Sequence, residues 1–127
     1  MPTYKCGFEK LEVWKEARIY VSSIYNLTKK YPKEEKLGLC SQMQRAVVSV
    51  SSNIAEGVSR SSAKEQIRFV EISYGSLMEV YSQLCLSEDL GYISSEEFDV
   101  LRPTINKIAI QLSGLRNSAL KRIESEK

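Results

Sequence analysis

The chain has 127 residues, of which 43% are hydrophobic and 27% charged, and its formal net charge is +2 at pH 7. These values are ordinary for one soluble globular domain covering residues 1–127, and so mild a charge does not by itself indicate a nucleic-acid partner. No apolar run approaches the roughly 18 residues of a membrane span, and the charged N-terminus lacks the apolar core of a signal peptide. We therefore expect a cytoplasmic protein with no membrane partner.

The residue types that the sequence lacks limit the reactions and the metal sites that we expect of this chain. The sequence contains no histidine, which removes the commonest general base, the Ser-His and Cys-His nucleophile pairs and the commonest metal ligand. The three cysteines, Cys6, Cys40 and Cys85, are too widely spaced for a disulfide framework or a paired metal site. We expect them to be small buried hydrophobic residues in a reducing compartment, and we expect neither a cofactor nor a metal.

The first predicted element is a helix over about residues 9–31. Its apolar side chains recur at three- and four-residue steps, which is the period of one helical face. Pro32 ends the helix, because proline disfavours helical geometry in the residue before it. The residues of this face are Val13, Trp14, Ala17, Tyr20, Val21, Ile24, Thr28 and Tyr31.

The second predicted element, over about residues 35–59, contains four residues, 48–51, that alternate apolar and polar side chains as a half-buried strand does. A wider window favours a helix, because apolar residues recur at three- and four-residue steps throughout it. These apolar residues are Leu39, Met43, Val47, Val50, Ile54 and Val58. A polar stripe follows the same helix and consists of Arg45, Ser49, Asn53, Glu56 and Arg60.

The third and fourth elements each begin with the pattern of a capping box, a serine followed three residues later by a glutamate. Ser62 and Glu65 begin a helix over about 63–90, and Ser94 and Glu97 begin one over about 95–121. The third helix has two apolar stripes on roughly opposite faces, and we expect both to be buried. The first stripe is Ile67, Val70, Tyr74, Met78, Tyr81 and Cys85, and the second is Phe69, Ile72, Ser76 and Val80.

The fourth helix has one apolar face, and Pro103 within it is expected to kink the helix or delay its regular part. The residues of that face are Phe98, Leu101, Ile105, Ile108, Leu112 and Leu115. Four amphipathic helices with short connections predict an all-α fold, an antiparallel up-down-up-down four-helix bundle. The alternative is an α/β fold, but only residues 47–50 offer a strand for it.

Several short matches over about residues 8–92 resemble one bacterial family. They are Phe8-Glu9-Lys10-Leu11-Glu12-Val13-Trp14, Tyr31-Pro32, Glu35, Gly38-Leu39, Gln42, Arg45-Ala46, Ser49, Asn53-Ile54-Ala55-Glu56-Gly57, Arg60, Gly75-Ser76 and Glu79. In these pieces the chain resembles the four-helix proteins of the 23S ribosomal RNA intervening-sequence family, which includes the accessory protein of diversity-generating retroelements. The fourth helix matches only in pattern, and Pro103 departs from it.

The resemblance implies an antiparallel four-helix bundle and a ring-like homopentamer. For the retroelement branch it also implies binding of RNA or DNA and of a reverse transcriptase. It does not imply an enzyme.

Five polar residues are candidates for a structural network between helices. Gly75 lets another backbone come close, and Glu79 lies one turn further along the same side of the third helix. Because buried charges persist only when they are paired, we expect these side chains to satisfy one another. Nucleic-acid contact by Arg45 and Arg60, and pairing across a subunit interface, are the alternatives. The predicted polar network is Arg45, Ser49, Asn53, Glu56 and Glu79.

Six basic residues are candidates for nucleic-acid binding, three on the first helix and three around the start of the third. Phosphate contact needs only lysine, arginine and backbone donors. For a lone monomer a solvated face is the simpler interpretation, whereas five copies around one axis would focus a strong positive field. The candidates are Lys15, Arg18, Lys29, Arg60, Lys64 and Arg68.

The second stripe of the third helix, Phe69, Ile72, Ser76 and Val80, supplies the candidate interface of a homo-oligomer. We therefore expect a non-enzymatic oligomer that binds RNA or DNA, as an accessory to a reverse transcriptase. A protein–protein scaffold or adaptor without nucleic acid is the alternative. Catalysis would need Glu56 and Glu79 as acid and base on facing helices, since no cysteine has a histidine partner.

Overall fold

The computed structural model describes residues 7–126, in which four long helices follow one another along the chain. No strand occurs in this range, and residues 48–51 lie in the middle of a helix, so the predicted all-α fold is confirmed and the α/β alternative is wrong. The elements are η1 (Gly7–Lys10), α1 (Glu12–Thr28), η2 (Lys33–Glu35), α2 (Leu39–Val58), α3 (Ala63–Asp89) and α4 (Ser95–Ser125), where η denotes a 3-10 helix.

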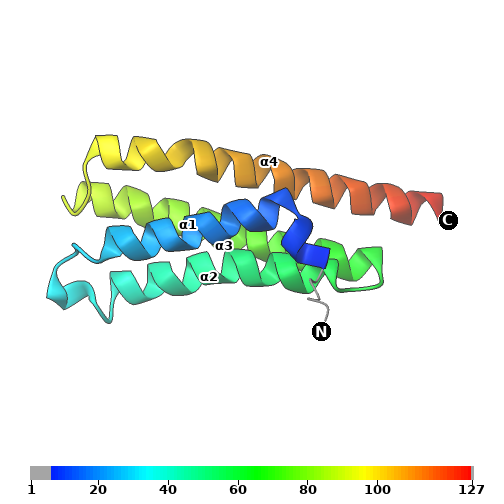
Figure 1. Cartoon of the computed structure of the whole chain (residues 1–127), viewed down its shortest axis with the longest axis horizontal. Helices are drawn as coiled ribbons and strands as arrows, with labels where there is room; N and C mark the ends of the chain where they lie inside the picture. Colours follow the sequence, from blue (N-terminus) through cyan, green and yellow to red (C-terminus); the bar gives the residue numbers. More distant parts are fainter. Residues whose placement is uncertain (1–6, 127) are drawn as a thin grey trace, which may run out of the picture.

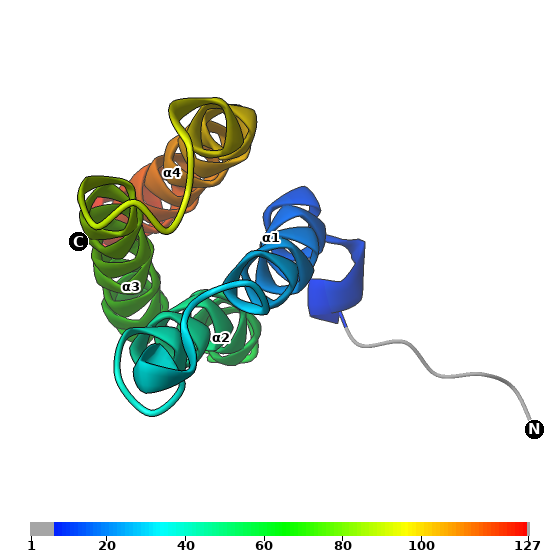
Figure 2. The same ribbon diagram turned by 90° about the vertical axis from the view of Figure 1, so that its left-hand side faces the viewer.

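The four helices run alternately in opposite directions, as Figure 1 shows, and each packs against the next one in sequence. Viewed from one end, they follow one another around the bundle in the order α1, α2, α3, α4 (Figure 2). The closest pairs are α2 with α3 and α3 with α4, and α1 contacts α4 least. The C-terminal part of α4 extends past the start of α1, so it packs mainly against α3 (Figure 1).

The helix bounds differ from the predicted ranges around α1 and α2. The segment expected as one helix over 9–31 is η1 followed by α1, and α1 ends at Thr28. The segment expected from residue 35 has a 3-10 turn there, and α2 begins only at Leu39. Two residues explain the delay: Pro32 disfavours helical geometry before it, and Gly38 adopts φ −104° and ψ −109°, outside the helical region. At the other end, α4 continues to Ser125, beyond the predicted 121.

The core lies between the helices and is made of aliphatic and aromatic side chains with almost no exposed surface. On α2 the buried face is the predicted one from Met43 to Ile54. Burying such side chains contributes roughly 1.5–3 kcal/mol each before the entropy cost of folding, so this core is the main source of stability. The largest fully buried side chains are Tyr20, Phe98, Ile24, Met43, Ile54, Leu77, Leu84, Ile105, Ile108, Leu112, Val47 and Val50.

On α3 the core face lies between the two predicted stripes. Its centre is Val70, Leu77 and Leu84 at seven-residue spacing, whereas Tyr74 and Met78 of the first stripe are 40% and 37% exposed. Two serines belong to this core face and hid it in the sequence pattern. Their hydroxyls are satisfied internally, because the Oγ of Ser73 donates to the carbonyl of Val50 at 2.8 Å and that of Ser87 to the carbonyl of Gln83 at 2.7 Å.

The structure shows which of the predicted capping residues form hydrogen bonds at the helix ends. Ser94 and Glu97 form a complete capping box at the start of α4. At α3 only half of the predicted box is present: the Oγ of Ser62 accepts from the N–H of Glu65, while the Glu65 carboxylate lies 3.9 Å from Arg60. The chain leaves α3 through Gly91, whose φ of 79° favours glycine.

Pro103 lies inside α4 without delaying it, because the helix begins at Ser95 and continues to Ser125. The helix therefore accepts the loss of one backbone donor at an exposed position. Among residues 7–126, no helix combines the length and the apolar character that crossing a bilayer requires.

Candidate nucleic-acid interface

The six candidate basic side chains are all exposed, and they lie at two ends of the bundle. Lys15 and Arg18 lie near the start of α1, close to the end of α2, where η1 packs. Arg60, Lys64 and Arg68 lie at the turn from α2 to α3, at this same end of the molecule (Figure 1). The structure separates Lys29 from them, because it follows α1, about 21 Å along the helix from Lys15 at 1.5 Å per residue.

Arg60 is the best-anchored member of this set. Its Nη2 donates to the Glu56 carboxylate at 2.7 Å, its Nε lies 3.9 Å from Glu65, and its guanidinium stands 4.9 Å from the centre of the Phe69 ring. Two carboxylates therefore compensate its charge. Arg60 is held in place by the protein itself and offers little free charge to a ligand.

Lys64 and Arg68 are different, because neither forms an ion pair within residues 7–126. Both flank an open depression on the first turns of α3, which Glu65 and Glu71 also line. They lie one turn apart on the same helix, where the ammonium group of Lys64 and the guanidinium group of Arg68 both face solvent. On α1 the charges are better satisfied: Lys15 lies 3.9 Å from Glu12, and Arg18 stacks over Trp14 at 5.5 Å.

Lys33 and Lys36 are not among the six predicted basic residues, yet the fold brings them to the same cavity as Lys29. The cavity lies at the connection from α1 to α2, is about 520 Å³ in volume, and is also lined by Tyr25 and Gln44. The sequence carries a signal for it, since lysines stand on both sides of Pro32 at 29, 30, 33 and 36. The predicted continuous helix through residue 31 concealed this arrangement.

The predicted polar network does not form as a buried cluster. Arg45, Glu56 and Glu79 are exposed, and Arg45 makes no ion pair with described residues. Ser49 and Asn53 do act together: the Asn53 amide donates to the carbonyl and the Oγ of Ser49, at 2.8 and 2.9 Å. Because the three charged side chains are exposed, water can solvate them without pairing.

The remaining polar contacts across this groove are local. The hydroxyls of Ser49 and Ser76 lie 2.8 Å apart and link α2 to α3, while Glu79 accepts from its own helix neighbour Gln83 at 3.3 Å. The pair of Glu56 with Arg60 is an exposed i, i+4 contact, worth about 0.3–0.5 kcal/mol. Within the single chain, this weak exposed contact is the one ion pair that Glu56 forms with described residues.

The candidate interface stripe divides between core and surface. Val80 is fully buried in the protomer, so it cannot contact another copy, and Phe69 packs against Gly57. Ile72 is 42% exposed and Ser76 is half-buried. The core face of α3 is rotated toward this stripe, so the stripe faces α2. Ile72 is the one large apolar residue of the stripe that faces solvent.

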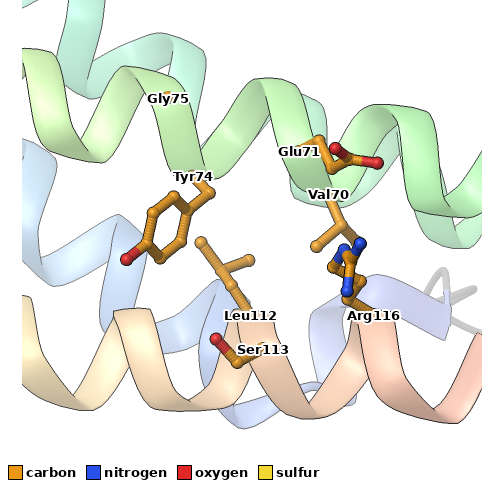
Figure 3. A pocket seen from close by; sticks show the side chains of 7 residues that line it. All are labelled: Val70, Glu71, Tyr74, Gly75, Leu112, Ser113 and Arg116. Carbon is orange, nitrogen blue, oxygen red and sulfur yellow. The ribbon is translucent and has the colours of Figure 1, made fainter.

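A cleft of about 300 Å³ lies between α3 and α4 (Figure 3). Val70 and Leu112 form its apolar floor, and the ring of Tyr74 forms one wall. Glu71 on α3 and Arg116 on α4 stand at one end of the cleft, and neither forms an ion pair within the described part of the chain. The cleft therefore combines an apolar floor with one free charge of each sign.

The candidate side chains for catalysis or metal binding are carboxylates and cysteines. Groups of three or more acidic or cysteine side chains that could hold a metal are absent there, and the structure brings Glu56 and Glu79 into no mutual contact. Cys40 is buried, its Sγ lies 3.7 Å from the carbonyl of Thr28, and burial raises the pKa of its thiol. Cys85 is half-buried, and Cys6 lies outside the described residues.

Known proteins match this chain at the level of family and fold. A family model described as 23S rRNA-intervening sequence protein matches residues 9–114. No curated protein matches the sequence. The chain is similar to a solved protein of unknown function from the S23 ribosomal protein family of Bacteroides thetaiotaomicron, with 23% identity, coverage of 82% of this chain and 97% of that chain, and a TM-score of 0.75. At this identity, the likeness establishes a shared fold.

Proposed function

The chain belongs to the 23S rRNA-intervening sequence protein family, and from this premise we propose that it is a non-enzymatic homo-oligomer that binds nucleic acid through exposed basic side chains. The observation that carries the proposal is the free pair Lys64 and Arg68. Both side chains are exposed and form no ion pair within residues 7–126. The neighbouring Arg60 is instead held in place by the carboxylates of Glu56 and Glu65. Phosphate oxygens are the ligands that such a pair attracts.

The proposed assembly is a ring of five copies. In a single chain the two unpaired positive charges attract phosphate groups only weakly. A ring repeats these charges around one axis and so focuses the positive electrostatic field. We propose that this ring acts as an accessory to a reverse transcriptase, the role that the resemblance to the retroelement branch implies.

Several features support a binding role over catalysis. The sequence has no histidine to act as a general base at neutral pH. The two glutamates suggested as acid and base, Glu56 and Glu79, are both exposed, and one of them is engaged by Arg60. The buried Cys40 has a raised thiol pKa, the opposite of what an activated nucleophile needs.

The test is a fluorescence-anisotropy titration of the intact protein with duplex and single-stranded probes over a range of salt concentrations. Replacing Lys64 and Arg68 by alanine should flatten the log–log salt dependence on duplex DNA by about 0.9 for each lost phosphate contact. The control, Lys10→Ala with Lys121→Ala, removes the same charge from exposed positions on η1 and α4 and should leave the slope unchanged. Absence of binding to every probe at low salt would overturn the proposal.

A protein–protein scaffold or adaptor is the second candidate function, and the cleft between α3 and α4 favours it. An apolar floor flanked by Tyr74 and a free Arg116 suits an apolar side chain of a partner better than a phosphate chain (Figure 3). If the intact protein binds no nucleic acid, this candidate remains. Pull-down of a partner by the parent chain but not by Tyr74→Ala would support it.

A further inference from the structure

The cavity at the connection from α1 to α2 combines features that no other described cavity shares. It is bounded by the last turn of α1, by η2 and by the first turns of α2, at the cyan end of the bundle in Figures 1 and 2. Three lysines, Lys29, Lys33 and Lys36, line it together with the aromatic ring of Tyr25. Its volume of about 520 Å³ lies within the range of small-molecule sites.

The lysines of this cavity form no ion pair with a carboxylate of residues 7–126. The side chains of Lys33 and Lys36 make no ion pair or hydrogen bond within residues 7–126, and the Lys29 ammonium donates only to the neutral amide oxygen of Asn26, at 3.3 Å. Three ammonium groups around one hollow repel one another, and a bound anion relieves that repulsion.

The neighbouring acidic groups are occupied elsewhere. Glu35 accepts from the Tyr92 hydroxyl at 2.8 Å and from the backbone N–H of Leu39 at 3.4 Å. Glu97 pairs with Lys30 and also closes the capping box of α4. Hydrogen bonds from a hydroxyl and an amide leave the Glu35 carboxylate charged, so Glu34 and Glu35 offset part of the charge of the three lysines, and the cavity keeps a net positive charge.

The aromatic ring of Tyr25, which lines the cavity, indicates which class of ligand the cavity binds. Tyr25 is 40% exposed, which leaves a ring face available in a site where a core tyrosine would be covered. Bases of unpaired nucleotides stack on such rings, while lysines hold the adjacent phosphates. An inorganic anion would need only the lysines, and a duplex keeps its bases stacked inside, away from a tyrosine ring.

We propose that this cavity holds one unpaired nucleotide of a single-stranded nucleic acid, with the phosphate at Lys29, Lys33 and Lys36 and the base against Tyr25. The inference rests on the proposed nucleic-acid function and adds a preference for single strands. It also adds a second contact point at the end of the bundle opposite Lys64 and Arg68.

The experiment measures anisotropy of a labelled oligothymidylate and of a duplex of equal length, bound to the intact protein over a range of salt concentrations. Tyr25→Ala should weaken single-strand binding by about 5- to 150-fold, while Tyr25→Phe should retain it. Neither change should affect duplex binding. Lys33→Ala with Lys36→Ala should flatten the single-strand salt slope by about 1.4, at about 0.7 per phosphate contact. The matched control is again Lys10→Ala with Lys121→Ala.

Three outcomes would overturn the inference. If the parent binds single strands and neither Tyr25→Ala nor the lysine pair differs from the control, this cavity is not the site, although the proposed function stands. If the parent binds no probe, both proposals fall. If a polyglutamate peptide binds with dependence on the two lysines and none on Tyr25, the cavity takes an acidic protein segment instead. Circular dichroism of each variant checks that the exposed substitutions leave the helices intact.

Discussion

At the scale of single residues, Tyr20 has the least usual surroundings in the core. Its side chain is fully buried, and its hydroxyl has no hydrogen-bond partner within residues 7–126. A polar oxygen removed from water without a partner reduces stability, even though the ring contributes favourably by its burial. Burial also raises the pKa of Tyr20, because the surrounding apolar side chains cannot solvate a phenolate.

Tyr20→Phe should therefore leave stability unchanged or raise it by about 1 kcal/mol at neutral pH, since it removes an unpaired hydroxyl from an unchanged volume. Thermal denaturation measures this. A clear loss of stability would show that the hydroxyl has a partner that the fold needs.

The same variant has an expected pH dependence. In the unfolded chain tyrosine ionises near pH 10, whereas folded Tyr20 keeps its proton to higher pH. Above pH 10 the unfolded state therefore binds fewer protons, and stability falls as the pH rises. Below pH 10 the stability that Tyr20 gains by keeping its proton is present in full, and it is lost as the pH rises further. Tyr20→Phe has no hydroxyl to ionise there, so the stability of the variant should fall less steeply above pH 10. Half-exposed Tyr74→Phe is the control, and equal declines in Tyr20→Phe and parent would contradict the argument.

At the scale of helices, α2 and α3 lie close together at Gly57. A Cβ placed there would stand 3.0 Å from the Cβ of Phe69, which can move only with the backbone of α3. The sequence suggested this role for Gly75, but a Cβ at Gly75 would have no neighbour within 4 Å, its own helix backbone aside. Gly75 is exposed at the cleft between α3 and α4, whereas Gly57 is buried and faces the adjoining helix.

The two glycines allow a matched comparison. Gly57→Ala should destabilise the protein by about 1–3 kcal/mol, because the added methyl group forces α2 and α3 apart. Gly75→Ala should stabilise it by about 0.5–1 kcal/mol, since alanine loses less backbone entropy in an exposed helix interior. Urea unfolding of both variants measures the difference. Equal stabilities would show that the contact at Gly57 relaxes without cost.

At the scale of the whole molecule, exposed apolar side chains on α3 are the features that assembly would explain. Ile72 is 42% and Leu86 49% exposed, on a helix whose core face is already covered. Singly exposed apolar side chains are ordinary on a protein surface, and the proposed assembly would give these two a contact with another copy. Since Ile72 lies outside the protomer core, replacing it tests assembly without disturbing the fold.

Ile72→Asp should convert the proposed pentamer of 14.4 kDa chains into monomers while its circular dichroism spectrum stays helical. A carboxylate buried at an interface without a partner opposes association strongly. Sedimentation velocity at micromolar concentration measures the mass. Ser82→Asp, an equal charge change at another exposed position of α3, is the control and should remain assembled. A parent chain that sediments as a monomer would overturn the proposed ring.

The sequence alone determined the helices, because their periodicity, caps and breaks are local properties of the backbone. The apolar steps from Met43 to Ile54 placed the core face of α2 correctly despite the alternating residues 48–51. Ser94 with Glu97 marked the start of α4 for a similar reason, since both partners of a capping box lie within one turn.

Only the tertiary structure decided which polar side chains are buried and which distant residues meet. Ser73 and Ser87 lie in the core because carbonyl groups accept their hydroxyls, whereas Arg45 and Glu79 remain in water. The lysines at 29, 33 and 36 meet Tyr25 because the chain turns back between α1 and α2. Periodicity specifies the faces of a helix, but the neighbours that cover each face are fixed by packing between segments far apart in sequence.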